Sequence, residues 1–501
     1  MILLLAIYTQ KYCLKRNLAT SLLNMVSNDL KVFLSSISVN LMALIAGIGY
    51  SWSSPCTPKL RSVTDPDNNP LGRQATLEEI SWITSLHALG SLIGPLFTGI
   101  VSKSFGKKFT LIIFSLSQLV SSLILIFAFE VKHFYVARFL LGIGTGSVFS
   151  VIPSFVGEIS PTRVRGRTSM LNSVLLTAGQ TLVLIVGPFV TIRTIAFMTI
   201  IIYFVFLTTF SYFVPQSPYD YVMRGRPDKA KATLRKWGRR DSLEKELLEI
   251  VTICEESSKE QSLKTIFKST ILKKCLLISL GLVSLQSLVG NPAIVAYQQT
   301  ILDLSKNSTV SSDIFIIIIS VVQLIGTYFS TTFVDRWGRK RLLIISYLGL
   351  FVPLAILGFY FFLLERNFNL DFFFWIPFTS ILIYILFYKI GAGPLPWTLS
   401  GEIFPPSFKP LLSTITVFCM TLINFLVTLV FPFISVYLGT AFSIWSFAVF
   451  SLISLIYISL FVPETKGKSL MEIQKMLLGE KNVIKHVREA INFNSNASNL
   501  E

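Results

Sequence analysis

The stretch "LFYKIGAGPLPW", residues 386–397, combines features that an ordinary transmembrane helix does not tolerate together. It ends an apolar segment that begins at Phe372, yet two glycines, two prolines and Lys389 fall within it. Irregular backbone at membrane depth occurs only where it is packed inside the protein or lines a water-filled cavity. The stretch therefore predicts a broken helix in the interior of a membrane protein, with the candidate hinge residues Gly391, Gly393, Pro394 and Pro396.

The composition of the whole chain indicates a membrane protein. Of the 501 residues, 52% are hydrophobic and 14% are charged, against roughly 25% charged in an ordinary soluble domain. A helix needs about 20 apolar residues to cross the hydrocarbon core, and the chain contains twelve such runs. The sequence therefore predicts an all-α integral membrane protein with twelve transmembrane helices.

The distribution of charge predicts the orientation of the chain. When both termini are placed in the cytoplasm, most of the 44 lysines and arginines adjoin the inner ends of spans, as the positive-inside rule requires. Contact with anionic lipid then explains the net charge of +17, and we expect no nucleic-acid partner. Arg138 and Lys389 differ from the other basic residues because they lie within spans.

The chain divides into two halves that echo each other. "SKSFGKKFTL" (102–111) matches "VDRWGRKRLL" (334–343), and "EISPTRVRG" (158–166) matches "EIFPPSFKP" (402–410). Two parallel repeats of six spans predict alternating access to a substrate held between the halves. The expected segments are a cytoplasmic N-terminal segment (1–32), two six-helix bundles (33–214 and 275–462), a cytoplasmic linker with short helices (215–274) and a cytoplasmic tail (463–501).

Several motifs resemble those of one known family. They are "EISPTRVRG" (158–166), "PQSPYDYVMRGR" (215–226), "VDRWGRK" (334–340), "GAGPLPW" (391–397) and "PETKGKSLMEI" (463–473). Over nearly its whole length the chain is similar to the sugar porter branch of the major facilitator superfamily. "GYSWSSP" (49–55) and "MLNSVLLTAGQTLVLIVGPFV" (170–190) look closest to the insect facilitated trehalose and hexose transporters. The resemblance implies the fold of that superfamily and transport of a sugar across the plasma membrane.

The resemblance also implies where a sugar binds. A sugar is uncharged and rich in hydroxyls, so its site needs amide, hydroxyl and indole groups that face inward from apolar helices. A lone intramembrane Gln or Asn can instead simply join two helices. The positions that match the sugar site of the family are Gln286, Tyr297, Gln323, Trp397 and Asn424.

Some positions depart from the family pattern. The family's "QQLSGIN" reads "QSLVGNP" at 286–292, and the glutamine expected in the fifth span is Ser173, which we keep as a candidate substrate contact. The set of hydrogen-bond donors is therefore depleted. This depletion indicates a substrate other than glucose, a low affinity or a loss of transport.

Lys389 occupies a position where relatives usually have an acidic or small polar residue. No Asp or Glu lies near the middle of any span, so we expect carbonyls freed by the helix break to accept its ammonium hydrogens. Two roles remain open. Lys389 either packs with its head group in trapped water or contacts the substrate.

Charged residues at the cytoplasmic ends of the spans are expected to form a gate. The resemblance implies a salt-bridge network that closes the inner side and consists of Glu158, Arg165, Asp335, Arg336, Arg339, Glu402 and Lys409. The two halves differ here, because Lys103 and Gln216 stand where the second half has Asp335 and Glu464. We expect this imbalance to favour an inward-open conformation.

Downhill, facilitative transport of a sugar such as trehalose or a hexose is the expected function. A proton-driven symporter resembling this family needs a carboxylate near the sugar, typically in the first span, where this chain has none, and we expect His87 of the second span to pack. A proton-coupled sugar or polyol symporter remains an alternative, as does a sugar sensor that no longer transports. The sequence contains no catalytic triad, nucleotide loop or metal constellation, so we expect neither an enzyme nor a cofactor.

Two further expectations concern the surface of the protein. Asn307 begins an Asn-Ser-Thr sequence in a predicted outer loop and is a candidate glycosylation site. Apart from the sugar and the lipid bilayer we expect no partner, and we expect the protein to function as a monomer.

Overall fold

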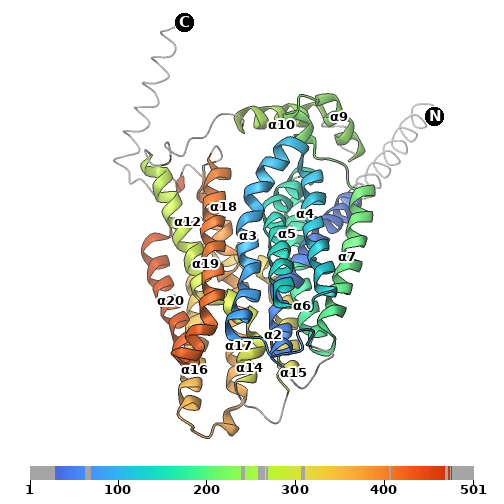
Figure 1. Ribbon diagram of the computed structural model, residues 1–501. Coiled ribbons are helices and arrows are strands. Elements are labelled where there is room, and N and C mark those ends of the chain that lie inside the picture. The colour runs from blue at the N-terminus through green and yellow to red at the C-terminus, as the bar shows by residue number, and fades with distance from the viewer. Residues whose placement is uncertain are drawn as a thin grey trace, which may run out of the picture.

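The computed structural model describes residues 29–62, 69–161, 163–237, 243–257, 266, 269–305, 311–405, 408–468, 472–473 and 476, without the side chains of 331–336 and 410. Over these residues the chain forms a bundle of helices (Figure 1), and they contain no strand. The prediction of an all-α protein is confirmed.

The twelve predicted spans are confirmed. Each is a helix, continuous or broken, that is long and apolar enough to cross a membrane. The spans run over Asp29–Arg61, Leu77–Phe105, Lys107–Ile126, Val131–Ile159, Arg165–Phe189, Ile192–Phe213, Thr270–Ala296, Ser312–Ser330, Arg339–Glu365, Asp371–Ile403, Leu411–Tyr437 and Thr440–Phe461.

The first half contains the first six spans. Thr76 begins the second span as the N-cap, because its hydroxyl accepts from the Glu79 N–H and the Glu79 carboxylate accepts from the Thr76 N–H. The first span begins with a helix over residues 29–51. The other helices of this half are α2 (Ser53–Arg61), α3 (Leu77–Phe105), α4 (Lys107–Ile126), α5 (Val131–Ile159), α6 (Arg165–Val186), η1 (Gly187–Phe189) and α7 (Ile192–Phe213).

The second half contains the last six spans, two of which are broken. The tenth span consists of α17 (Trp375–Phe387), a π-helical turn η3 (Tyr388–Ala392) and α18 (Leu395–Ile403), as the glycines and prolines predicted. The other elements are α12 (Thr270–Leu288), α13 (Asn291–Ala296), α14 (Gln298–Asp303), α15 (Ser312–Trp337), α16 (Arg339–Glu365), η2 (Asp371–Phe373), α19 (Lys409–Tyr437) and α20 (Thr440–Phe461).

The break in the seventh span was not predicted. The sequence indicated one helix over 275–297, but α12 ends at Leu288 and Gly290 adopts a φ of 91° before α13 begins. A Cβ at Gly290 would lie 2.3 Å from the Phe447 ring, so both its backbone angle and the close packing of α20 require glycine there. Hydropathy alone does not reveal such a break, although Gly290 and Pro292 are residues of the same types as those that mark the break in the tenth span.

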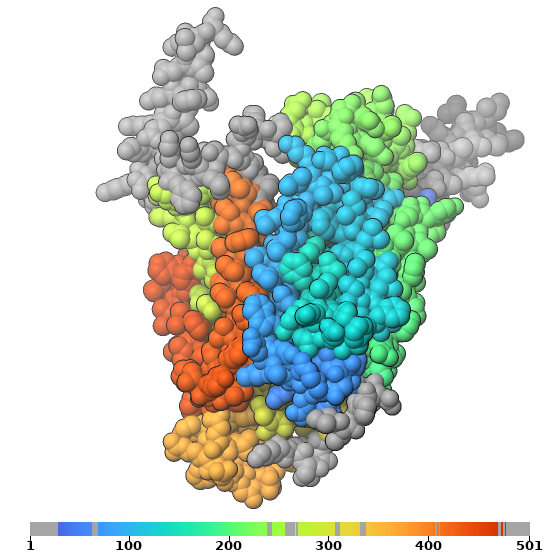
Figure 2. All heavy atoms as spheres, in the orientation of Figure 1, coloured from blue at the N-terminus to red at the C-terminus, as the bar shows by residue number. Residues whose placement is uncertain are grey.

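The segment between the halves contains short helices. They are α8 (Pro218–Met223), α9 (Pro227–Lys236) and α10 (Leu243–Ser257), and Leu234, Leu243 and Ile250 form a small buried core between them. In Figure 2 these green helices lie over the end of the blue and cyan first half. We call this the linker end of the molecule and the opposite end the far end.

The two halves lie side by side along their length. Helix α3 of the first half packs against α19 of the second, and α6 packs against α15. Figure 2 shows the contact between blue α3 and orange α19. A site between the halves is therefore bounded by these four helices and by the broken span that carries η3, which packs on α15 and α16.

Candidate functional site: a polar cluster between the halves

Ser346 of α16 holds the broken tenth span together. Its hydroxyl donates to the Phe387 carbonyl at 2.7 Å and accepts from the Ala392 N–H at 2.8 Å, on the two sides of η3. A Cβ at Gly391 would lie 2.5 Å from the Ser346 Cβ, so this approach requires glycine. The backbone groups released by the break thus find a partner inside the protein.

Gln286 of α12 joins the same break. Its Nε2 donates to the Gly393 carbonyl at 2.8 Å and lies 3.3 Å from the hydroxyl of Tyr388. Its Oε1 is buried and has no hydrogen-bond partner among the described residues. Because a buried amide oxygen without a donor is costly, this atom is an acceptor available to a water molecule or a ligand hydroxyl.

A second group of polar side chains meets where the two halves touch. Gln323 of α15 donates from Nε2 to Oε1 of Gln180 of α6 at 2.5 Å. Lys389 of η3 places Nζ 3.4 Å from the same Gln180 oxygen and 3.5 Å from the Thr177 hydroxyl, which lies 3.3 Å from the Thr327 hydroxyl. These five residues, called the central cluster below, link α6 of one half to α15 and η3 of the other.

The prediction that freed carbonyls hold the Lys389 ammonium is wrong. The Phe387 carbonyl is taken by Ser346 and the Gly393 carbonyl by Gln286, while Lys389 reaches across to α6. Neutral hydroxyl and amide groups satisfy the break without the cost of drawing a charge into a closely packed position.

The exposure of side chains along α6 shows where the interface between the halves opens. Ser173, Thr177 and Gln180 are four and three residues apart and therefore lie on one face of the helix. Ser173 is exposed, whereas Thr177 and Gln180 are buried. The face of α6 that meets the other half is thus accessible toward the linker end and covered at the central cluster.

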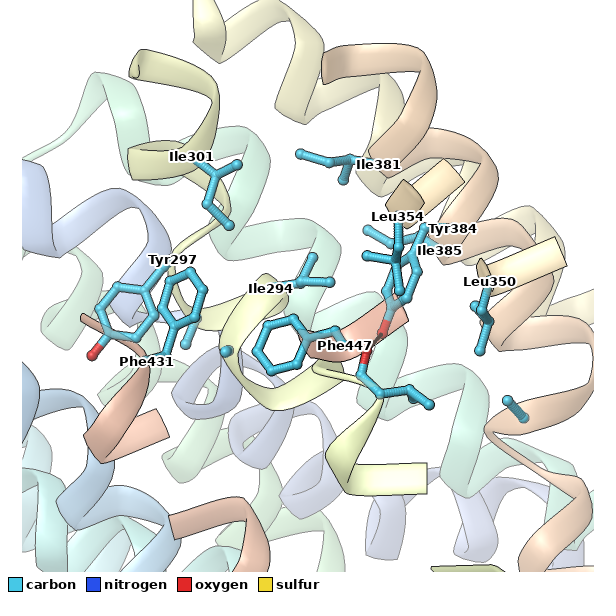
Figure 3. Close-up of a cluster of buried hydrophobic side chains, with 14 of the residues drawn as sticks. Ile294, Tyr297, Ile301, Leu350, Leu354, Ile381, Tyr384, Ile385, Phe431 and Phe447 are labelled. Carbon is cyan, nitrogen blue, oxygen red and sulfur yellow. Dashed lines mark hydrogen bonds between the residues drawn. The ribbon is translucent and has the colours of Figure 1, made fainter. Parts of the chain in front are cut away.

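The other predicted substrate residues lie around the central cluster at different heights. Tyr297 is buried toward the far end, where its ring stacks on Phe431 (Figure 3) and its hydroxyl donates to the Thr428 carbonyl at 3.2 Å. Asn424 of α19 is partly exposed, and Trp397 of α18 is 37% exposed. Of the predicted set, Gln323 and Lys389 contact α6 of the first half at the central cluster.

Sequence reasoning missed three residues of this cluster, namely Gln180, Thr177 and Thr327. The most informative of them is Gln180. It lies in "TAGQTLV" (177–183), a single glutamine in an apolar span, but an amide was sought at the position of Ser173. The structure supplies that amide seven residues later on the same helix face, so the donor set is less depleted than predicted. Tyr388 was also missed, although it directly precedes Lys389.

Glu402 is the centre of a charged network at the linker end of the second half. Arg339 donates to it from Nε and Nη2 at 3.2 and 3.0 Å, and the Thr465 hydroxyl donates to it as well. Glu464 accepts from the N–H groups of Arg339 and Lys340 at 3.0 and 3.1 Å. Since these residues begin α16, the Glu464 carboxylate also benefits from the positive end of that helix.

The first half repeats this network with one exchange. Glu158 accepts from Lys107 and from the Ser217 hydroxyl, as Glu402 does from its partners in the second half. At the start of α4, however, the carboxylate comes from Asp220 of α8, which accepts from the Lys107 N–H at 2.8 Å and from Gln216 Nε2 at 2.9 Å. Asp220 thus replaces the acid that Gln216 lacks, so the predicted imbalance between the halves is smaller than the sequence indicated.

The remaining predicted gate residues take other places. Arg165 lies 3.5 Å from the Ser160 carbonyl and Lys409 donates to the Gly401 carbonyl at 3.0 Å, so in this conformation both bond to backbone rather than to the glutamates seven residues before them. Three predicted sites lie outside the description, namely the side chains of Asp335 and Arg336 and the residue Asn307.

Hydrogen bonds between the halves continue from the central cluster toward the far end. Thr181 donates to the Ser320 carbonyl at 3.0 Å, and the Gln299 N–H donates to the Ser54 hydroxyl at 3.2 Å. The Ser81 hydroxyl donates to the carbonyl of Leu429. These bonds hold the halves together at the far end.

Comparison with known proteins identifies the family of a chain with this architecture. Residues 39–477 match the model of the family described as sugar (and other) transporter. The chain belongs to this family of sugar transporters. The facilitated trehalose transporter Tret1 of Culex quinquefasciatus is 29% identical over 89% of this chain and 86% of its own length, and the facilitated trehalose transporter Tret1-2 homolog of Drosophila simulans is 31% identical over 89% and 91%.

Solved structures of sugar transporters share the fold. The inward open xylose transporter XylE from E. coli superposes with a TM-score of 0.73 at 23% identity, over 89% of this chain and 99% of its own. The proton:xylose symporter XylE bound to 6-bromo-6-deoxy-D-glucose superposes with a TM-score of 0.69 at 23% identity, over 88% and 99%. The predicted major facilitator superfamily fold is confirmed, and this sugar transporter is not an enzyme.

Proposed function

We propose that this sugar transporter carries a sugar such as trehalose or a hexose down its gradient by alternating access. The observation that carries this proposal is the central cluster, in which amides and hydroxyls from both halves meet inside the bundle. A ligand that replaces the bond between Gln180 and Gln323 would contact both halves at once. Its binding would therefore respond to the movement of one half against the other.

The ionisable groups inside the bundle support uniport. The guanidinium of Arg138 donates to the carbonyls of Gly49 and Ile83 at 2.7 and 3.1 Å and to the Ser53 hydroxyl at 3.1 Å, and arginine does not lose its proton in proteins. In the described spans no carboxylate approaches it, so the first half offers no acidic group that could bind and release a proton beside this cation.

His87 is the group that a proton-coupled alternative would require. Its Nε2 lies 3.1 Å from the Thr145 hydroxyl, between α3 and α5 of the same half, and its side chain is buried. This position inside one half favours a packing role over a role in coupling to a sugar between the halves.

The positions of the bonds between the halves support an inward-facing resting conformation. The halves are joined at the central cluster and toward the far end, while the networks of Glu158 and Glu402 each lie within one half at the linker end. We propose that the linker end faces the cytoplasm of a plasma-membrane protein, as the positive-inside rule favours, and that the protein functions as a monomer. Epitope tags at both termini should become accessible to antibody only after permeabilisation.

Uptake of radiolabelled trehalose and hexoses into oocytes tests the transport proposal. We expect saturable uptake of at least one of these sugars that does not change between pH 5.5 and 7.5 and survives a protonophore. Collapse of uptake with the protonophore would establish a symporter instead. Absence of uptake with the protein at the cell surface would leave the sensor as the function.

A further inference from the structure

Lys389 is a cation inside the bundle whose contacts are two neutral oxygens. These are Gln180 Oε1 at 3.4 Å and Thr177 Oγ1 at 3.5 Å, both longer than the roughly 2.7–2.9 Å usual for a charged donor. The Gln180 oxygen also accepts the closer amide of Gln323 at 2.5 Å, so the lysine shares it. No salt bridge among the described residues includes Lys389.

Arg138 shows how this protein satisfies another cation that lies within a span. Arg138 is 1% exposed, its guanidinium donates to three oxygens at 2.7–3.1 Å, and it lies 5.0 Å from the ring centroid of Trp52. Lys389 by contrast is partly exposed and has three ammonium hydrogens for two long contacts. Ionisable residues at membrane depth are costly, and those without a structural partner mark the path of an ion or a substrate.

The surroundings of Lys389 suit a ligand that carries both a negative charge and hydroxyls. The ammonium lies between the halves on the face of α6 that is accessible at Ser173. Gln286 contacts the neighbouring Tyr388, and its buried Oε1 has no hydrogen-bond partner among the residues that the structure describes, so it can accept from a ligand hydroxyl. The Gln323 amide donates a hydrogen bond to Gln180, and it can donate to a ligand oxygen instead.

We propose that Lys389 is an anion-recognition residue and that the central cluster binds a sugar acid, a hexose-sized polyol with one carboxylate. The carboxylate forms a charged hydrogen bond with the Lys389 ammonium, and the hydroxyls bind the amides of Gln286, Gln180 and Gln323. One lysine balances one negative charge, so a monocarboxylate fits better than a phosphate monoester with nearly two charges. This inference rests on the proposed transport function and adds a substrate class to it.

Transport of such a substrate has an electrical consequence. Uniport of a monoanion moves one negative charge per cycle, so inward transport of a sugar acid produces an outward current, whereas uptake of trehalose or a hexose produces none. This difference separates the two substrate classes in one cell.

The test compares glucuronate with glucuronamide, which has an uncharged amide in place of the carboxylate. We measure competition by each compound against radiolabelled glucuronate on the purified full-length protein at constant ionic strength, together with glucuronate currents in oocytes. We expect glucuronate to bind at least tenfold more tightly than glucuronamide. The ratio should fall to about one in Lys389→Met and remain in Lys389→Arg, while Lys132→Met, an exposed lysine at the far end, should leave it unchanged.

Each outcome decides the matter. Equal affinities in the unmodified protein overturn the inference even if Lys389→Met fails to fold, and so does a preference that survives Lys389→Met. If uncharged sugar is taken up and glucuronate is not preferred, the sugar-acid inference is rejected and the proposed transport function stands. Binding of glucuronate without transport of any sugar rejects the proposed function and leaves the anion site standing.

Discussion

Gln323 donates to Gln180 across the boundary between the two six-helix halves, with 2.5 Å between Nε2 and Oε1. Each amide comes from a helix that packs on the other half, since α6 and α15 lie side by side. Lys389 adds a third contact to the same oxygen. A change at Gln180 therefore affects both halves and Lys389 at a single point.

Replacing Gln180 by Leu should impair transport. The change removes the acceptor of Gln323 and of Lys389, and an unpaired buried donor costs about 1–3 kcal/mol. We expect sugar uptake at low concentration to fall at least tenfold, about 1.4 kcal/mol, with the protein still at the cell surface.

The matched control is Gln118→Leu. Gln118 of α4 is buried and neither of its amide atoms has a partner among the described residues, so Leu removes a polar group that is not satisfied. Uptake and thermal stability should hold or improve. Equal loss of uptake in the two variants would show that any buried glutamine matters and would contradict a special role for Gln180.

Gly391→Ala should disrupt the broken span. The added Cβ would lie 2.5 Å from the Ser346 Cβ and 3.0 Å from the Leu342 carbonyl, so the hydroxyl could no longer bridge the break. We expect a lower melting temperature and at least a tenfold loss of uptake. Gly157→Ala in α5, where a Cβ meets no atom within 4 Å, should cost nothing, and equal behaviour of the two variants would refute the argument.

Asp220 should make stability depend on pH. Burial raises its pKa from 3.8 to about 6, with the backbone hydrogen bond from Lys107 opposing the rise. The folded state therefore binds the proton of Asp220 more tightly than the unfolded state does. The stabilisation that this proton provides is fully present below about pH 3.8 and is lost as the pH rises through about 6.

The variant Asp220→Asn isolates this effect, because the amide oxygen can still accept from the Lys107 N–H but does not titrate. Between pH 5 and 7.5 the unmodified protein should lose about 1 kcal/mol of stability relative to Asp220→Asn, seen as a shift of a few degrees in melting temperature. Asp228→Asn, an exposed acid of α9, should show no such difference. A gap between the proteins that stays constant across this range would refute the assignment.

Lys103→Asp should shift the transporter outward. Lys103 is exposed near the linker end of α3, which packs on α19, and α19 begins at that end with Lys409. The positive N-terminal end of a helix stabilises a nearby carboxylate. Lys103→Asp should therefore raise the population of the conformation in which the linker end is closed, on the order of two- to fivefold. Gln216→Glu should add little, because Asp220 already supplies a carboxylate there.

Labelling of Ser173→Cys from the two sides of the membrane measures this shift, since Ser173 is exposed on the α6 face that meets the second half. The parent without this cysteine gives the background from native thiols. We expect cytoplasmic labelling to fall in Lys103→Asp and to fall little further in the double variant. Unchanged labelling would show that Lys103 does not influence the conformation.

The sequence alone determined the architecture and the kind of site. Twelve spans, the six-plus-six division and the break at 391–396 follow from hydropathy and from glycine and proline positions, which are local properties of the chain. The amides of Gln286 and Gln323 and the charge of Lys389 could also be identified from the sequence, because polar residues stand out within apolar spans.

Only the tertiary structure decided which of these groups meet. Gln180 rather than Ser173 faces Gln323, and Lys389 reaches across to α6 instead of to the broken backbone beside it. Asp220 takes the place in the first half that Glu464 takes in the second. These pairings join elements far apart in the chain, and they depend on the rotation and height of each helix against its neighbour, which packing fixes and hydropathy does not encode.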